Sequence, residues 1–475
     1  MVAEGLSKQP IDAISKSIVS RGFNCVRLTY ATFMLTNKSL SSLTVKRSFE
    51  LLNLTNALHG IGIHNPSILN LTLIQAYQAV VSNLGENNIM VILDNHLTKP
   101  GWCCPQTDGN GFFGDIYFHP HVWIQGLKNM ATLFHDASNV VGMSLRNELR
   151  GPRQNVSKWY SYMQEGAEAI HAANPKVLVI FSGLDVDKDF RFLLSRQVNL
   201  SFTGKLVFEV HWYSFSDSDK WSTLSTNRAC ANTSVDLMRK SGFLLEKEWP
   251  LFMSEWGVDN SGVVDNDNRY FGCVLAKAAE LDLDWGLWAL QGSYYLREGV
   301  VDHEETYGVL SSDWSTSQNN SVLKKIQAVQ KPFQGPGYAN VLPHKKIFHP
   351  ATALCVTQKP WHVLQLGPCN QSTAWRYTKE GNIKLRTGLS CIKEGPVGEP
   401  VRLGNNCYGE RWERVSASKM HLASMYNNEG NRVCLDVDHD SKTIVTKSCK
   451  CVSDDHNCDP TSQWFKLVKS TWNFH

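Results

Sequence analysis

Two glutamates are the residues in this sequence best suited to chemistry. Glu148 closely follows the apolar run at residues 140–145, and Glu255 directly follows the apolar run at residues 251–254. Two carboxylates on different strands suit cleavage of a glycosidic bond, because one can protonate the leaving oxygen while the other attacks the anomeric carbon. A purely structural pair is disfavoured, since burying two carboxylates is costly. We therefore take Glu148 and Glu255 as a candidate catalytic pair, one of which would act as the acid/base and the other as the nucleophile.

Further polar and aromatic side chains stand at the ends of similar runs. The candidate substrate-binding residues are Arg27, His96, Asn147, His211, Tyr213 and Trp288. Aromatic rings offer apolar faces to sugar C–H groups, and Asn, His and Arg side chains bind hydroxyls and tune carboxylates. Simpler explanations stay open for three of them. Arg27 could merely pair with buried carboxylates, His96 could cap a strand, and Trp288 could pack in a core.

The elements that must position these residues alternate between short apolar runs and helical periodicity from residue 11 to about residue 330. The predicted strands are 23–28, 89–93, 140–145, 177–181, 205–210, 251–254 and 284–288. Short apolar strands of this kind are typical of a parallel sheet buried on both faces. Repeated β-α units predict a (β/α)8 TIM barrel or a doubly wound sheet, and reactive residues of a barrel stand at the carboxyl ends of its strands.

A closed barrel needs eight strands, but the sequence supplies seven and opens on a helical pattern at residues 11–21. We expect the missing strand to be the first, upstream of Met1. An open edge would leave backbone groups unpaired and invite aggregation. The sequence therefore predicts an amino-terminally incomplete form of a longer enzyme.

The last quarter of the chain has a different character. After the breaker-rich segment 331–337 the helical periodicity stops, and three cysteine-bounded units follow at 355–369, 391–407 and 434–449. Each unit is closed by a tryptophan, at Trp375, Trp412 and Trp464. Three similar all-β units predict a threefold repeat. The predicted domains are a barrel at 1–332, a linker at 333–337 and an all-β domain at 338–475.

Cysteine usage bears on the compartment. Eight of the 13 cysteines lie beyond residue 350, which is typical of a disulfide framework, whereas the paired Cys-x-x-Cys spacing of a zinc site is absent. Acceptor sequences for N-glycosylation stand at Asn37, Asn53, Asn70, Asn155, Asn199, Asn232, Asn319 and Asn370. These features predict a secreted or vacuolar protein. The first residues contain no signal peptide, which agrees with a lost amino terminus.

Composition excludes several classes of partner. A net charge of +3 in 475 residues argues against nucleic acid or an anionic membrane, and no apolar run approaches the length of a membrane span. No GxGxxG or Walker A loop follows a strand, which disfavours a nucleotide. Asp108-Gly-Asn-Gly lacks the spaced acidic ligands of a calcium loop and is predicted to be a turn. We expect a monomer with a carbohydrate substrate, no cofactor and no metal.

Two motifs add a family resemblance that covers roughly residues 5–330. Residues 144–148 (SLRNE) and 251–257 (LFMSEWG) resemble the acid/base and nucleophile motifs of glycoside hydrolase family 5, which belongs to the clan of retaining barrel glycosidases. The resemblance implies that Glu148 is protonated near neutral pH, that Arg27 and Tyr213 donate to Glu255, and that His211 faces the acid/base. It also implies that Asn147 binds the substrate 2-hydroxyl and that Trp288 is a sugar platform.

The carboxy-terminal segment resembles a ricin B-type β-trefoil lectin domain. Residues 434–438 (CLDVD) match the sugar-binding signature of that family, but the usual Gln two residues before each closing Trp is replaced by Thr373, Glu410 and Ser462. In the third repeat alone an aspartate, Asp436, stands at the sugar-binding position. A glycan at the third repeat and a purely structural or docking role both remain open.

The combined prediction is retaining hydrolysis of β-linked glucosides, diglycosides or glucan and mannan chains. A catalytically silent carbohydrate-binding protein and a transglycosylase are the alternatives. The loops at 98–118 and 214–233 are expected to form walls of the site. Cys230 is expected to tie them together through Cys103 or Cys104.

Overall fold

The computed structural model describes residues 2–334, 342–424, 432–438, 440 and 442–471. The chain divides into two compact units that do not follow the sequence order. The first comprises Met1–Trp212, Leu237–Asn260 and Asp284–Gln318, and the second comprises Tyr213–Asp236, Ser261–Leu283 and Asn319–His475. Of the predicted linker, residues 335–337 lie outside the described residues, so the domain boundaries stay predictions.

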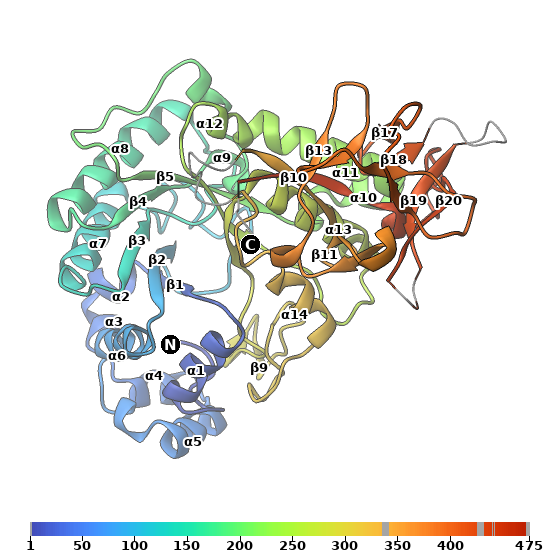
Figure 1. Cartoon of the computed structure of the whole chain (residues 1–475). Helices are drawn as coiled ribbons and strands as arrows, with labels where there is room; N and C mark the ends of the chain where they lie inside the picture. Colours follow the sequence, from blue (N-terminus) through green and yellow to red (C-terminus); the bar gives the residue numbers. More distant parts are fainter. Residues whose placement is uncertain (1, 335–341, 425–431, 439, 441, 472–475) are drawn as a thin grey trace. The chain divides into compact units, whose positions relative to one another are not determined.

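A parallel sheet of seven strands in sequential order forms the centre of the first unit (Figure 1). Its strands are β1 (Cys25–Ala31), β2 (Met90–Leu97), β3 (Val140–Ser144), β4 (Leu178–Phe181), β5 (Leu206–Trp212), β6 (Leu251–Trp256) and β7 (Asp284–Leu287). All seven predicted runs are strands, and neighbouring strands pair in parallel. The predicted β/α barrel fold with seven strands, followed by an all-β region, is confirmed.

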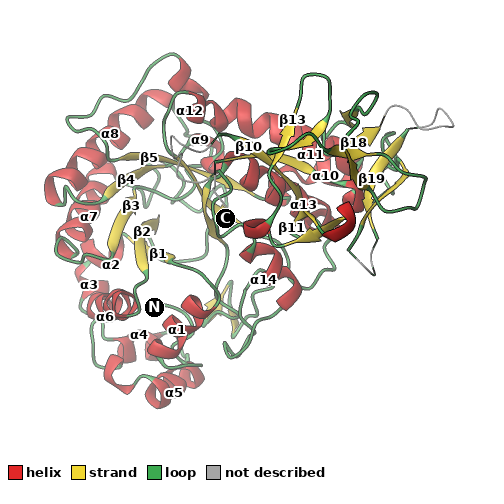
Figure 2. Ribbon diagram, viewed as in Figure 1, coloured by secondary structure: helices red, strands yellow, loops and turns green. Residues whose placement is uncertain are grey.

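Helices of the first unit connect these strands, and α6, α7 and α8 lie along the outer side of β1–β5 in Figures 1 and 2. The helices are α1 (Ile11–Ser20), α2 (Phe33–Thr36), α3 (Lys38–Ser41), α4 (Val45–Leu51), α5 (Thr55–His64), α6 (Leu73–Glu86), α7 (Pro120–Leu133), α8 (Val156–Ala173), α9 (Leu184–Asp187) and α12 (Phe243–Glu246). Local sequence explains where several begin. Thr72 and Gln75 form a capping box at the start of α6, and Pro120 occupies the first turn of α7, where its missing N–H costs nothing. A short hairpin, β8 (Leu296–Arg297) and β9 (Val300–Val301), follows β7.

The second unit combines four helices with an all-β region. The helices are α10 (Ser218–Thr223), α11 (Thr226–Leu237), α13 (Asp265–Leu281) and α14 (Asn320–Gln327). Residues 214–233, predicted as a loop, are therefore largely helical, and Trp221 of α10 packs its buried ring on Tyr270 of α13. This apolar contact is long-range, which local sequence could not reveal.

Antiparallel strands make up the rest of the second unit. They are β10 (His344–His349), β11 (Leu354–Gln358), β12 (Leu364–Gly367), β13 (Trp375–Tyr377), β14 (Ile383–Leu385), β15 (Cys391–Lys393), β16 (Arg402–Gly404), β17 (Trp412–Val415), β18 (His421–Ser424), β19 (Val433–Val437), β20 (Ile444–Ser448) and β21 (Lys466–Ser470). They form sheets of eight and four strands around one apolar core that includes Trp375 and Trp412. Trp464, the third closing tryptophan, is also fully buried. This arrangement is consistent with a trefoil.

Asp436, the aspartate of the third repeat, forms hydrogen bonds within the fold. Asp436 is 3% exposed, its Oδ1 accepts from the Val437 N–H at 2.7 Å, and its Oδ2 accepts from Gln463 Nε2 at 3.0 Å. Both carboxylate oxygens therefore have partners within the fold. This favours a structural role, and a glycan at this repeat stays a prediction.

The disulfides partly match expectation. Bonds join Cys355–Cys369, Cys391–Cys407 and Cys434–Cys449, and a fourth joins Cys451–Cys458. The predicted disulfide framework is thus confirmed. The expected bond from Cys230 to Cys103 or Cys104 is wrong, because Cys230 pairs with Cys273 and the two adjacent cysteines pair with each other. Helices α11 and α13 bring Cys230 and Cys273 together.

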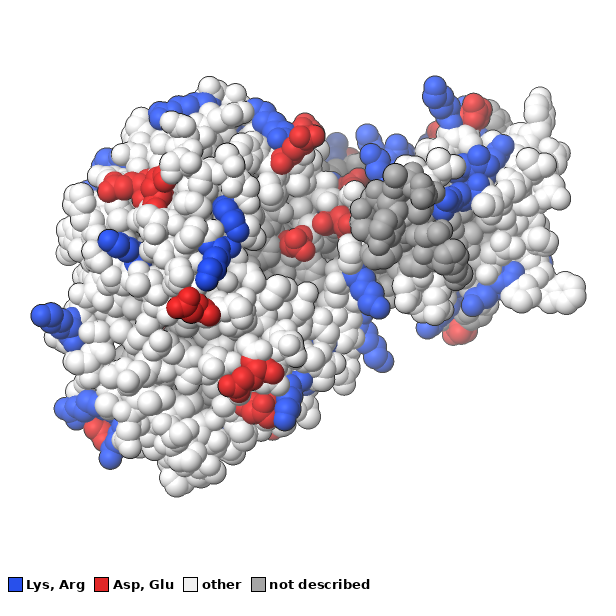
Figure 3. Space-filling model, turned by 60° about the vertical axis from the view of Figure 1, so that its left-hand side comes forward, with Lys and Arg blue, Asp and Glu red and all other residues white. Residues whose placement is uncertain are grey.

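Charge and hydropathy agree with the composition. On the face drawn in Figure 3, basic and acidic side chains are interspersed rather than gathered by sign. Among the described residues, no helix combines the length and apolar character needed to cross a bilayer.

Candidate active site

The register of the sheet brings the candidate residues to one end. His211 on β5 lies directly opposite Glu255 on β6, and Asp94 on β2 lies opposite Thr29 on β1. Glu148 follows β3 by four residues. Because carboxyl ends of parallel strands share one edge, residues far apart in sequence converge there.

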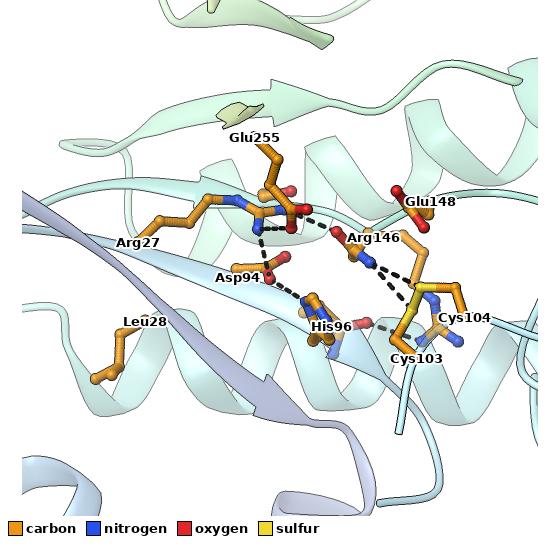
Figure 4. Close-up of polar contacts among 12 residues, drawn as sticks. Arg27, Leu28, Asp94, His96, Cys103, Cys104, Arg146, Glu148 and Glu255 are labelled. Atoms are coloured by element: carbon orange, nitrogen blue, oxygen red, sulfur yellow. Dashed lines mark hydrogen bonds and ion pairs between the residues drawn. A yellow bond between two sulfur atoms is a disulfide. The ribbon is translucent and has the colours of Figure 1, made fainter. Parts of the chain in front are cut away.

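Arg27 connects the candidate nucleophile to the rest of the site. It is the third residue of β1 rather than the last, since the strand continues to Ala31, and its long side chain covers the remaining distance. Its Nη1 lies 2.7 Å from Glu255 Oε1 and 3.1 Å from Asp94 Oδ2 (Figure 4). Burial lowers the pKa of Arg27, but Asp94, Glu255 and Glu209 outweigh it and raise the pKa above its ordinary value. Arg27 therefore stays cationic beside Glu255.

His211 contacts both candidate catalytic carboxylates. Its Nδ1 lies 2.9 Å from Glu148 Oε1 and 3.6 Å from Glu255 Oε2. Burial lowers the pKa of His211, but Glu255, Asp187 and Glu148 outweigh burial and raise it to about 10. The imidazole is thus protonated at neutral pH and donates to Glu148.

This contact corrects the expected ionisation of Glu148. Burial raises the pKa of Glu148, as expected, but the hydrogen bond and charge of His211 outweigh it and hold the pKa below its ordinary value. The opposite shifts of the two pKa values favour the proton on His211, one hydrogen bond from Glu148. The pair holds a single proton between them.

Asp187 supports Glu148 through the backbone. Glu148 has a left-handed backbone with φ of +44°, and its N–H donates to Asp187 Oδ2 at 2.8 Å. The same oxygen lies 3.5 Å from His211 Nε2. Asp187 is itself held in the left-handed region, with φ of +58°. Such conformations are uncommon for residues other than glycine and cluster at functional sites.

His96 and Trp288 form an aromatic wall. The His96 ring stacks on Trp288 with centroids 5.8 Å apart, and its Nδ1 lies 2.7 Å from Asp94 Oδ2. Trp102 meets Trp288 edge-on at 6.5 Å. Trp288 is only partly buried, so part of its ring stays accessible. The open explanation of Trp288 as core packing is thereby disfavoured.

Tyr213 belongs to the second unit, unlike the other candidates. It follows β5, is buried, and stacks on Phe215 with centroids 4.5 Å apart. Its expected donation to Glu255 stays a prediction.

Sequence reasoning missed several supporting residues. Asp94 stands two positions before His96, and this strand spacing puts both on one face, a signal that was available. No sequence pattern around Asp187 indicates that it contributes to the site. Arg146 and Arg150 flank Glu148 and are fully buried.

These two arginines fasten the long loop after β2. Arg146 donates to Thr98 Oγ1 at 2.9 Å and to the Asn110 carbonyl at 2.5 Å. Arg150 pairs with Asp108 at 2.6 Å. Asp108 also accepts from the Asn110 N–H at 2.8 Å, so the Asp-Gly-Asn-Gly segment is the turn that was predicted.

Within the part of the chain that the structure describes, two sets of side chains have donor atoms close enough for a metal ion, Cys103–Cys104–Glu148 and Glu148–His211–Glu255. The sulfurs of the first set are joined in a disulfide and offer no thiolate. In the second set, the carboxylates around His211 raise its pKa to about 10, so a metal ion would have to displace the imidazole proton before it could bind there.

Comparison with known protein families assigns this chain to a family. The model of the cellulase family, glycosyl hydrolase family 5, matches residues 4–293. The chain belongs to glycosyl hydrolase family 5. It is therefore a glycoside hydrolase by family, and the paired glutamates stand within the matched region.

Two relatives of this family 5 chain align over most of its length. A glycosyl hydrolase 5 family protein of Chamaecyparis obtusa is 44% identical over 485 residues, which cover 98% of this chain and 86% of that protein. An endoglucanase of Paenibacillus polymyxa is 25% identical over 351 residues, covering 69% of this chain and 79% of that protein.

Solved structures share the fold of the family 5 unit. A hyperthermophilic endocellulase of the archaeon Pyrococcus horikoshii aligns with a TM-score of 0.53 and 19% identity, covering 69% of this chain and 88% of that one. The catalytic domain of the major endoglucanase of Xanthomonas campestris pv. campestris aligns with a TM-score of 0.55 and 17% identity, covering 69% and 90%. At these identities the likeness is one of fold.

Proposed function

We propose that this family 5 member is a retaining β-glycosidase that cleaves β-linked glucans or glucosides. The observation that carries the proposal is the spacing of the two glutamates. One oxygen of Glu148, one of Glu255 and one nitrogen of His211 lie within 4.8 Å of one another. Retaining glycosidases hold their carboxyl groups about 5–5.5 Å apart, whereas inverting ones leave room for a water at about 6.5–9.5 Å.

In the first step Glu255 attacks the anomeric carbon while the glycosidic oxygen takes a proton from Glu148. Arg27 places its cation 2.7 Å from Glu255, beside the carboxylate that attacks. His211 hands its Nδ1 proton to Glu148 across 2.9 Å, and Glu148 passes it to the leaving group. The products of this step are the free leaving-group alcohol and a glycosyl ester on Glu255.

In the second step Glu148, now ionised, removes a proton from water as that water attacks the anomeric carbon. The ester bond to Glu255 breaks, and the two inversions together retain the anomeric configuration. Asn147 contributes by binding the 2-hydroxyl, an interaction that strengthens in the transition state. Trp288 and His96 present ring faces to the sugar.

The preference for glucans draws on the endoglucanases among the relatives and fold neighbours. A mannan substrate and transglycosylation are the alternatives within the same chemistry. A silent carbohydrate-binding protein is disfavoured by the paired carboxylates with their cationic partners Arg27 and His211.

The proposal is tested with purified protein on β-1,4-glucan, mixed-linkage β-glucan, β-mannan and aryl β-glycosides. Proton NMR during the first minutes should show the β-anomer of the new reducing end before mutarotation. Initial formation of the α-anomer would contradict the retaining mechanism. A lack of turnover on every substrate would contradict the proposal that the protein is an active glycosidase. Sugar-to-sugar transfer products in excess of free sugar would favour the transglycosylase.

We also propose that the protein is made in an oxidising compartment, as a secreted or vacuolar protein. Six disulfides among its cysteines support this, since such bonds are rare where thiols are kept reduced. Counting free thiols in unfolded protein isolated from its source tests it, and one free thiol, that of Cys25, is expected.

A further inference from the structure

Two adjacent cysteines lie inside the site without a role in the scheme above. Cys103 and Cys104 are joined in a disulfide within the loop between β2 and α7, and both are partly exposed. Figure 4 shows the pair beside Glu148. Each sulfur lies within 4.8 Å of a Glu148 carboxylate oxygen.

This disulfide does not serve as an ordinary fold staple. A disulfide stabilises a protein mainly by restricting the unfolded chain, and the effect grows with the length of the loop that it closes. Cys103 and Cys104 are one residue apart, whereas Cys230 and Cys273 are 43 apart. The loop that carries the adjacent pair is already fastened by Arg146 and Arg150. Any effect of this disulfide must therefore come from the side chains that its sulfurs contact.

The local contact is with Asn147. Its Nδ2 lies 3.4 Å from Cys103 Sγ and 3.5 Å from Cys104 Sγ. On its other side, Asn147 Oδ1 accepts from Arg27 Nη2 at 3.0 Å. Arg27 can only donate and disulfide sulfur can only accept, so the two partners together fix which way the amide faces.

An amide nitrogen carries two N–H groups. With one directed at the sulfurs, the other is left for a hydroxyl of the substrate. Reduction would replace two sulfurs that only accept with two thiols that can also donate, so the sulfurs would no longer restrict the Asn147 amide to one orientation. The oxidised pair is thus the form that suits this orientation.

We propose that the Cys103–Cys104 disulfide is a positioning group of the active site, which orients the Asn147 amide toward the 2-hydroxyl of the sugar at the cleaved bond. This inference rests on the proposed glycosidase function. It makes the oxidised disulfide a determinant of how strongly the enzyme discriminates between sugars with and without that hydroxyl.

The test compares the full chain with its C103A/C104A variant on an aryl β-cellobioside and on the analogue lacking the 2-hydroxyl at the cleaved sugar. The variant should lose about 10- to 100-fold in kcat/KM on the normal substrate, because misplacing a group by about 1 Å can cost that much. On the 2-deoxy analogue the loss should stay below about threefold. Equal losses on both substrates would overturn the inference and leave the glycosidase proposal standing, whereas no turnover by the parent chain would overturn both.

Two further measurements separate positioning from stability. With Asn147→Ala already present, C103A/C104A should change the rate on the normal substrate by less than about threefold, since coupled residues do not add. The control variant C230A/C273A opens a long chain loop, so it should lower Tm without changing the ratio of rates on the two substrates. An additive loss in the first case, or a changed ratio in the second, would contradict the proposal.

Reduction provides an independent readout. Treatment with a phosphine, which becomes phosphine oxide as the disulfide becomes two thiols, should reproduce the selective loss in the parent chain. The same treatment should leave the substrate ratio of C103A/C104A unchanged. If mass spectrometry shows both thiols alkylated while the ratio in the parent is unaltered, the disulfide does not position Asn147.

Discussion

The Nδ1 of His211 lies 2.9 Å from Oε1 of Glu148, and the raised pKa of His211 together with the lowered pKa of Glu148 favours the proton of this pair on the imidazole. When the neighbouring imidazole carries the proton, that proton remains available for transfer at a pH where an isolated carboxyl group is already ionised. The contact therefore bears directly on the pH range of catalysis.

The first prediction concerns that range. In the parent enzyme the basic limb of the kcat/KM profile should reflect loss of the shared proton, toward the His211 pKa of about 10. His211→Gln removes the cation, so the limb should move to lower pH, to the pKa of Glu148 alone. An aryl glycoside with a poor leaving group is the substrate to use, and His135→Gln, a partly exposed histidine elsewhere in the first unit, is the control. An unmoved limb would show that the shared proton is not the catalytic one.

The second prediction concerns stability. Because the pKa of His211 is raised to about 10 from its ordinary value of 6.5, its stabilising contribution is complete below about pH 6.5 and is lost as pH rises toward 10. The free energy of unfolding of the parent should thus fall more steeply between these pH values than that of His211→Gln. Urea unfolding at several pH values measures this, and parallel curves would contradict it.

The third prediction separates the two glutamates. Glu255→Ala should lose several orders of magnitude in turnover on every substrate, because no other group can form the glycosyl ester. Glu148→Ala should spare substrates with good leaving groups, which need little protonation. A 2-fluoro glycoside should label Glu255, and a label found on another residue by peptide mass spectrometry would refute the assignment.

The fourth prediction concerns Asp187. Asp187→Ala leaves the buried Glu148 N–H without its acceptor, which should cost about 1–3 kcal/mol of stability and reduce activity on poor leaving groups. Asp187→Asn keeps an oxygen in place and should retain most of the stability. Thermal unfolding of both variants measures the difference in stability. Equal Tm values for Asp187→Ala and Asp187→Asn would mean that the 2.8 Å hydrogen bond does not contribute to stability.

The fifth prediction concerns the second unit. Asn227 on α11 donates to the Cys451 carbonyl at 2.7 Å, and its Oδ1 accepts from Trp464 Nε1 at 2.9 Å. Asn227→Ala would leave both buried partners unpaired, so it should cost about 2–4 kcal/mol. Ser222→Ala, at an exposed position of α10, should be neutral. A small loss for Asn227→Ala in chemical denaturation would show that water replaces the side chain.

The sequence by itself determined the strands of the sheet and the positions of Glu148 and Glu255. Both depend on local patterns, since short apolar runs predict buried parallel strands and a strand end predicts where a reactive side chain stands. It also predicted the cysteine-bounded units of the all-β region. These features need no knowledge of which segments meet.

The tertiary structure decided everything that depends on distance and burial. The pKa of Glu148 is lowered and that of His211 is raised, because each pKa is set by neighbouring charges and burial that involve residues distant in sequence. Asp187 became visible only once the chain after β4 was seen to reach the Glu148 backbone. The partner of Cys230 was mispredicted for the same reason, since α11 and α13 meet only in the folded chain, and the disulfide left to Cys103 and Cys104 is the one that contacts Asn147.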